Sequence, residues 1–205
     1  MATKRPLCIY SGRVEELRAS DSEPPMAGLI LRRGSIHRPS AYTTAGLNTF
    51  TSVLGRLYYA PFFVGRETTI DQVGCEVTTA GAGSTVYAGI YGTQLVSGVE
   101  HPGALLASMS ADGGTTGGKS GSISPAITLL PGQMYWTAML AAGGTAPVMR
   151  AIAAAAYWPV LLNGLGVLVT YMYTTGHSSL PNPAPTSGYS TVSASAGPAV
   201  HVQVI

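Results

Sequence analysis

Beyond residue 40 the chain consists of short runs in which apolar and polar residues alternate, the period-2 pattern of strands with one buried face. In residues 69–79, Val73, Cys75 and Val77 belong to a mostly apolar set that is expected to face inward, and Asp71 belongs to the same set. Runs of this kind predict seven or eight short strands. They cover residues 56–64, 69–79, 84–92, 122–130, 133–141, 148–152, 165–173 and 199–205.

Turn-forming residues separate the predicted strands. Residues 80–83 read as a glycine-rich turn, residues 112–121 as a Gly/Thr/Ser loop, and residues 175–197 as a long loop rich in Ser, Pro and Gly. The final run, residues 199–205, alternates so cleanly that we expect it to pair inside a sheet. Together these signals predict an all-β protein with a jelly-roll-like β-sandwich over residues 40–205.

Residues 1–39 lack this regularity. Pro6–Tyr10 is a short strand candidate, and Arg13–Arg18 is a polar piece that is either helical or extended. Prolines end that piece, and a basic stretch, Arg32–Arg38, follows a short apolar run. We therefore expect residues 1–39 to form an arm without a core of its own.

Charged side chains are concentrated in this arm. They make up 10% of the whole chain, against about a quarter in typical soluble domains. Up to Arg38 there are seven Lys/Arg and four Asp/Glu, whereas beyond Lys119 the one charged residue is Arg150. A surface so poor in charge is expected to be covered by other subunits. The net charge of +2 is too small to indicate a nucleic-acid partner.

The sequence offers little support for catalysis or for a bound metal or cofactor. Cys8 and Cys75 lie far apart and give no metal-ligand spacing, and no phosphate-loop or dinucleotide motif occurs. Asp71 and Glu76 could form the carboxylate pair of a polysaccharide-degrading enzyme, but no sequence feature brings them together. We expect no enzyme activity, no catalytic residue, no metal and no cofactor.

Residues 151–173 carry no charge and are long enough to span a membrane as a helix. Pro159, Asn163 and Gly164 interrupt this segment, however, and its Val- and Tyr-rich second half is typical of a buried strand. We expect no membrane insertion.

Aromatic residues in predicted loops are the candidates for ligand contact. Tyr157 and Trp158 precede a proline, and His177 and Tyr189 lie in the long Ser/Pro/Gly loop. Tyr and Trp at such positions stack on sugar rings and anchor interfaces, although Trp158 could equally fill the core. Trp136 lies within an alternating strand and is expected to be buried.

Several short motifs follow one another along the chain. They are Arg56–Val64, Thr69–Thr79, Gly89–Gly92 (GIYG), Pro102–Leu106 (PGALL), Leu130–Trp136 (LPGQMYW) and Pro198–Ile205. In this order they resemble a β-sandwich module common in tail fibre and minor tail proteins of tailed bacteriophages and related gene transfer agents. Lys4–Leu17 separately resembles the segment with which many phage fibre and appendage proteins begin.

The resemblance implies a non-enzymatic structural component of a virion, made in the cytoplasm of the bacterial host and commonly a homotrimer. The arm would attach to other virion proteins, and the residues expected at that contact are Leu7, Ile9, Tyr10, Val14 and Leu17. The sandwich would form a short fibre or spike that binds a host-surface polysaccharide. The alternative is a purely architectural head-decoration, neck or tail protein that binds no host receptor.

Overall fold

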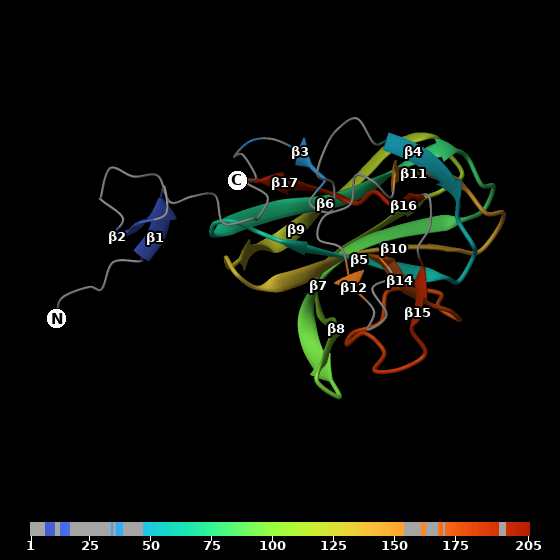
Figure 1. The fold of residues 1–205 in the computed structure, drawn as a ribbon. Helices are drawn as coiled ribbons and strands as arrows, with labels where there is room; N and C mark the ends of the chain where they lie inside the picture. Colours follow the sequence, from blue (N-terminus) through green and yellow to red (C-terminus); the bar gives the residue numbers. More distant parts are fainter. Residues whose placement is uncertain are drawn as a thin grey trace.

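The computed structural model describes residues 7–10, 13–16, 34, 36–38, 47–153, 161–162, 168–169, 171–192 and 196–205. Every regular element among these residues is a β-strand, and two antiparallel sheets pack face to face (Figure 1). The predicted all-β class and the β-sandwich are confirmed.

The first sheet has six strands in the order β15–β14–β5–β10–β7–β8, and all neighbours are antiparallel. The edge strand β8 was not expected from the alternation, because Pro102 and Gly103 interrupt the pattern there. The bounds are β5 (Leu57–Phe63), β7 (Thr85–Val96), β8 (Val99–Asp112), β10 (Met134–Ala142), β14 (Tyr171–Thr174) and β15 (Ser190–Val192).

The second sheet has seven strands. β16, β11, β6, β17 and β3 are neighbours in that order, β4 adds to β11, and β9 adds to β6. The final strand, β17, lies between β6 and β3, so it pairs inside a sheet as predicted. The bounds are β3 (Ile36–His37), β4 (Leu47–Thr51), β6 (Thr68–Thr79), β9 (Gly117–Leu129), β11 (Val148–Ala153), β16 (Ala196–Pro198) and β17 (His201–Val204).

Two short hairpins complete the described strands. β1 (Leu7–Tyr10) pairs with β2 (Arg13–Glu16), and β12 (Leu161–Leu162) pairs with β13 (Leu168–Val169). The strand predicted near the start of the chain is therefore confirmed, and the described part of the polar piece after it, Arg13–Glu16, is extended rather than helical. β3 falls within the predicted arm of residues 1–39 and is hydrogen-bonded to β17.

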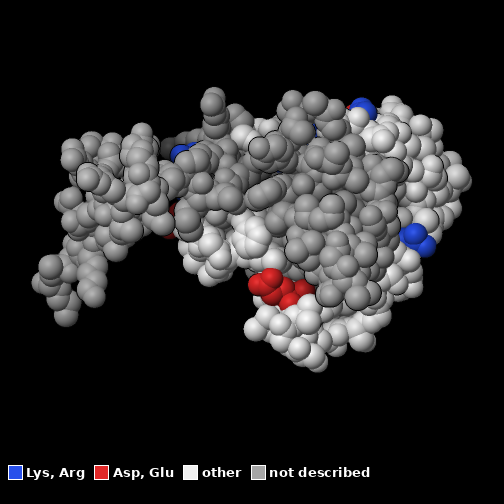
Figure 2. All heavy atoms as spheres, viewed as in Figure 1, with Lys and Arg blue, Asp and Glu red and all other residues white. Residues whose placement is uncertain are grey.

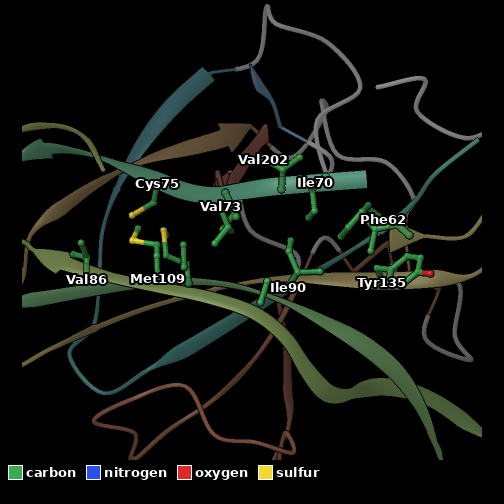
Figure 3. Close-up of a cluster of buried hydrophobic side chains, with 14 of the residues drawn as sticks. Phe62, Ile70, Val73, Cys75, Val86, Ile90, Met109, Tyr135 and Val202 are labelled. Carbon is green, nitrogen blue, oxygen red and sulfur yellow. The ribbon is translucent and has the colours of Figure 1, made fainter. Parts of the chain in front are cut away.

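The main core lies between the two sheets. Val73, Cys75 and Val77 of β6 are buried there, as their alternation predicts. Figure 3 shows side chains from both sheets meeting in this layer, with Val73, Cys75 and Val202 on one side and Val86 and Ile90 on the other. Interdigitating apolar side chains of two facing sheets are what hold a sandwich together.

One position breaks the predicted alternation. Ile70 is fully buried and Asp71 is half-buried, whereas the sequence pattern places Asp71 in the inward set. Opposite these residues the pairing of β6 with β9 and with β17 shifts register, between Ile70 and Gln72. Such a bulge adds one residue to the strand and exchanges the two faces beyond it. Asp71, which the alternation groups with the fully buried Val73 and Val77, is therefore only half-buried at the bulge, with its Oδ1 enclosed.

Two predicted loops also contain strands. β9 begins at Gly117, inside the predicted loop of residues 112–121. β15 lies inside the predicted loop of residues 175–197, and β16 begins inside it. Backbone pairing needs no side chain, so Gly and Ser can form an edge strand where sequence propensity argues against one. At Gly121 the missing side chain is required, because a Cβ there would lie 2.5 Å from the Cβ of Met109 in β8.

Candidate functional site

A second apolar layer covers the outer face of the first sheet. In β5, β7 and β10, the side chains that point away from the main core are apolar too. They are buried although no second sheet covers that face. Trp136 is fully buried, as predicted, but it lies in this outer layer. The layer comprises Leu57, Tyr59, Tyr91, Trp136, Ala138, Leu140 and Met172.

Residues 175–189, here called the strap, cover this layer. Leu180, Ala184 and Tyr189 of the strap pack directly against it. A Cβ on Gly89 of β7 would lie 2.7 Å from Cδ1 of Leu180, so the strap approaches the sheet as closely as glycine allows. The long Ser/Pro/Gly loop predicted from the sequence is thus a packed segment over this part of its length.

One tyrosine hydroxyl ties the strap to the sheet, and a second forms a hydrogen bond within the strap. Tyr91 of β7 donates a hydrogen bond to the carbonyl oxygen of Pro181 at 2.7 Å, and Tyr189 donates to the carbonyl oxygen of Pro185, also at 2.7 Å. Burial raises the pKa of Tyr189 to about 12. Its hydroxyl therefore keeps its proton at neutral pH and remains a donor.

The strap also caps the open edge of β8. The amide of Ala184 donates to the carbonyl oxygen of Gly103 at 2.8 Å, and the amide of Leu105 donates to Oδ1 of Asn182 at 3.1 Å. Unpaired backbone groups on an edge strand invite pairing with other chains. The strap occupies two of these groups and so blunts the edge at this point.

His177 fastens the beginning of the strap. Its amide donates to the carbonyl oxygen of Gly55 at 3.0 Å, and its Nε2 shares a hydrogen bond of 2.8 Å with Oγ1 of Thr174. Burial lowers the pKa of His177, which favours the neutral imidazole. His177 is therefore an anchor of the strap.

Tyr189 stands at the other end of the strap in an aromatic row. Its ring centroid lies 5.8 Å from that of Tyr59 and 4.7 Å from that of His101. The ring of Tyr59 in turn lies 5.4 Å from that of Tyr91, edge to face. These contacts and the bond to Pro185 commit most of the Tyr189 side chain to packing within the chain.

The other predicted contact residues are Tyr157, Trp158 and the attachment residues of the arm. Tyr157, Trp158 and Leu17 lie outside the described residues. Of the predicted attachment residues, Leu7, Ile9 and Tyr10 lie in β1 and Val14 lies in β2. The register of this hairpin places Ile9 opposite Val14, Leu7 opposite Glu16 and Tyr10 opposite Arg13.

The β7–β8 hairpin extends past the body of the sandwich, at the bottom of Figure 1. Val96 pairs with Val99, and the two residues between them, Ser97 and Gly98, have φ values of 52° and 80°. Positive φ at both central residues is the mark of a tight type I′ turn. Residues 95–99, here called the hairpin tip, present Leu95 at 70% exposure and Val99 at 58%.

Sequence reasoning missed both the tip and the outer layer, although each leaves a signal. The tip reads Leu-Val-Ser-Gly-Val over residues 95–99, a turn dipeptide flanked by apolar residues. The signal of the outer layer is the sequence of β5, Leu57–Phe63, which is a nearly continuous apolar run instead of an alternating one. Such a run indicates a strand that is covered on both faces.

The outer face of the second sheet carries an ionic cluster instead. Arg150 of β11 holds Glu76 of β6 in two hydrogen bonds, Nε–Oε2 at 3.1 Å and Nη2–Oε1 at 2.7 Å. Arg38 lies 3.5 Å from the same carboxylate. The hydrogen bond from Arg150 is the main cause that lowers the pKa of Glu76. The one charged residue beyond Lys119 is thus paired with an acid.

Asp71 and Glu76 lie on the same strand, five residues apart. At a rise of about 3.3 Å per residue their backbones are separated by roughly 16 Å. Carboxylate pairs in glycosidases lie about 5–9.5 Å apart. The arrangement in β6 therefore does not form the pair that a polysaccharide-degrading enzyme would need.

Within the described ranges, no group of three or more His, Cys, Asp or Glu side chains is placed to hold a metal ion. The same part of the chain contains no apolar helix long enough to cross a bilayer. A scan against models of protein families finds no match to this chain, and a search of curated protein sequences finds none.

Proposed function

We propose that this protein is a non-enzymatic structural component of a tailed phage or phage-like particle, which assembles with copies of itself and with other virion proteins. The observation that carries this proposal is the hairpin tip, where a tight turn holds Leu95 and Val99 in water at 70% and 58% exposure. Large apolar side chains displayed in this way mark an interaction surface.

The distribution of charge supports the same proposal. On the described part of the face in Figure 2, acidic and basic side chains occupy small, separate areas within a surface that is otherwise uncharged. Charges of both signs normally keep a free protein soluble. A surface with so few of them suits a subunit whose flanks are covered in an assembly.

The virion assignment rests on the resemblance of the motifs to phage tail fibre and minor tail proteins. The described motifs lie in strands of the sandwich, the first two in β5 and β6, GIYG in β7, PGALL in β8 and LPGQMYW at the start of β10. The arm would then attach the sandwich to another virion protein, and a trimer is the expected state.

Two tasks are open to such a subunit, receptor binding and pure architecture. The contacts of His177 and Tyr189 favour architecture for these two residues, because Nε2 of His177 and the hydroxyl of Tyr189 already bond within the chain. Binding of a host-surface polysaccharide would then rest on Tyr157 and Trp158. A glycan array with the wild-type chain and with Trp158→Ala separates the tasks: receptor binding predicts a signal that the variant loses, and architecture predicts none.

Light scattering on the purified chain tests the proposal itself. At micromolar concentration we expect the mass of a homo-oligomer, with a trimer as the expected size. A stable monomer over the whole accessible concentration range would contradict the assembly role. Imaging of the particle with an antibody to the sandwich would locate the subunit on head, neck or tail.

A further inference from the structure

We infer that Arg38, Glu76 and His201, here called the latch, form an acid-sensitive device that holds β3 on the sandwich at neutral pH and releases it in mild acid. The inference concerns contacts within one chain, so it goes beyond the proposed assembly role and does not depend on it. Because β3 lies within the predicted arm of residues 1–39, the latch controls how this part of the arm is held.

The backbone of β3 makes few contacts with the sandwich. The strand is two residues long, and its pairs with β17 are Ile36–Gln203 and His37–Val202. The amide of Gly34 adds a hydrogen bond of 2.7 Å to the carbonyl oxygen of Val204. Ile36 is 65% exposed and buries little apolar surface. So short a strand gains little from pairing alone, which makes the side chain of Arg38, directly after it, important for its attachment.

The side chain of Arg38 crosses the neighbouring strand to reach its partner. β17 lies between β3 and β6, so β3 and β6 are about 10 Å apart, twice the usual spacing of strands (Figure 1). Nη2 of Arg38 nevertheless lies 3.5 Å from Oε2 of Glu76 in β6. Its Nε is enclosed and has no hydrogen-bond partner among the described residues. The ion pair thus ties β3 to β6 across β17.

His201 of β17 lies where Arg38 crosses. Its partner in β6 is Gly74, and the register of β3, continued by one residue, places Arg38 on its other side. Cross-strand partners point to the same face, here the outer face that also carries Glu76. The imidazole lies against the backbone of Gly74, because a Cβ there would collide with Nε2 of the ring. His201 is 9% exposed, as expected for a ring that a crossing side chain covers.

Three charged side chains gather around His201 in the described part of the sheet. Arg38 and Glu76 form the ion pair of the latch, and Arg150 of β11 holds Glu76 in two further hydrogen bonds. The site therefore contains two cations and one carboxylate. A protonated His201 would be a third cation.

The other titratable groups on the adjacent strands face away or lie at a distance. Lys119 of β9 is opposite Cys75, and His37 is opposite Val202, so both lie toward the core side of the sheet. Asp71 precedes Gly74 by three residues in β6, which separates the two backbones by roughly 10 Å.

Protonation of His201 opposes the closed latch. Burial and then the charge of Arg38 lower the pKa of His201, and the charge of Glu76 offsets them only in part. At neutral pH the ring is therefore uncharged. In acid the imidazolium repels Arg38 and competes with it for Glu76, and both effects favour release of Arg38. In the open form the ring reaches water and regains its ordinary pKa of 6.5, so opening becomes more favourable as the pH falls below that value.

Amide hydrogen exchange of the full chain at pH 7.5 and pH 5.5 tests the latch. After correction for the intrinsic exchange rate, the protection of the Gly34 amide should fall by up to about tenfold at the lower pH, because protonation of the exposed ring favours opening. His201→Gln cannot take up a proton and should show equal protection at both pH values. His177→Gln removes a histidine of lowered pKa from the strap and should keep the fall of the wild type.

Each result bears on the latch. Protection of the Gly34 amide that is the same at both pH values in the wild type overturns it. A fall that persists in His201→Gln overturns it too, because another group would then be responsible. A fall that His201→Gln abolishes and His177→Gln retains supports it.

A second variant tests the crossing arginine at neutral pH. Arg38→Gln removes the ion pair and the cover of the ring, so the protection of the Gly34 amide should decrease at pH 7.5 and the pKa of His201, followed by NMR, should move toward 6.5. Lys119→Gln makes the same change of charge on the core side of β9 and should alter neither quantity. If either quantity is unchanged in Arg38→Gln, the latch is overturned. Both readouts concern contacts within one chain, so the assembly role is judged separately by light scattering.

Discussion

The outer faces of the two sheets differ in chemistry. The first sheet carries an aromatic outer layer, sealed by a strap that the chain itself provides. The second sheet carries polar side chains, including the paired Glu76 and Arg150, and leaves them in contact with water. A sandwich needs only one buried face per sheet, so the outer layer of the first sheet is an addition to the basic fold.

The difference shows what the additional layer does. On the second sheet the outer side chains could be exchanged for other polar residues with small effects on stability. On the first sheet they tie residues 175–189 to the sheet, and that segment in turn caps the edge of β8. The strap leaves the hairpin tip uncovered, with Leu95 at 70% exposure.

The largest effect is expected from emptying the outer layer. Trp136→Ala should lower the free energy of unfolding by about 3–5 kcal/mol, because it leaves a cavity beneath the strap. The substitution also removes the hydrogen bond of 3.0 Å from the indole nitrogen to Oγ1 of Thr93. Urea unfolding measures the change, with the more exposed Leu54→Ala as control. A loss below about 1 kcal/mol would show that the layer is not a second core.

A smaller effect is expected where the strap touches the sheet most closely. Gly89→Ala should cost about 1–3 kcal/mol, because the new Cβ would lie 2.7 Å from Leu180 and 3.0 Å from the carbonyl oxygen of Ala107. Gly118→Ala, where no atom lies within 4 Å, is the control. Cδ1 of Leu105 would also lie close to the new Cβ at position 89, at 3.2 Å. Adding Leu180→Ala should recover part of the loss, since it removes the shortest of these three contacts.

Absence of that recovery would assign the whole loss to the Ala107 carbonyl and the Leu105 side chain of β8 and would remove the strap from the explanation. The double-mutant cycle of Gly89→Ala and Leu180→Ala therefore measures how firmly the strap is seated on β7.

Sequence pattern was sufficient for the parts of the fold in which one face of a strand is apolar. Val73, Cys75 and Val77 face inward as their alternation predicts, and β17 pairs inside the sheet. The exchange of faces at Asp71 was not predictable, because it depends on the register of two partner strands. A register is a property of the assembled sheet and leaves no trace in the local alternation.

The candidate site was harder to predict for a related reason. His177 and Tyr189 were selected as loop residues available to a ligand, and the structure places both as anchors of the strap. Polar and Pro-rich composition indicates irregular backbone, but it does not tell whether that backbone lies free or packs on a sheet. The partner of the strap, the outward set of residues in β5 and β10, lies more than 30 residues away in sequence.

A further prediction tests the hydrogen bond between Tyr91 and the strap, with almost no change in packing volume. Tyr91→Phe removes the hydroxyl that donates to Pro181 and should lower the free energy of unfolding by about 1 kcal/mol. Amide hydrogen exchange should accelerate at Ala184 and Leu105, whose amides bond between strap and β8. Unchanged exchange at both amides would mean that the strap stays seated without this bond.

The smallest effect is expected on the second sheet, where Glu76→Gln removes an ion pair that remains partly exposed. Its side chain and that of Arg150 are 27% and 30% exposed, so solvent screens the interaction and the loss near neutral pH should be about 0.5–1 kcal/mol. Glu67→Gln, at an exposed acid in the turn before β6, is the control and should change stability less.

The pH dependence of that loss identifies the ion pair. Because Arg150 lowers the pKa of Glu76 in the folded state, the stabilisation is fully present above the ordinary value of 4.5 and disappears as the pH falls through the lowered pKa. Urea unfolding at neutral pH should therefore separate the wild type from Glu76→Gln, and unfolding in strong acid should bring the two curves together. A difference that persists in acid would assign the loss to packing, and the outer face of the second sheet would then resemble that of the first.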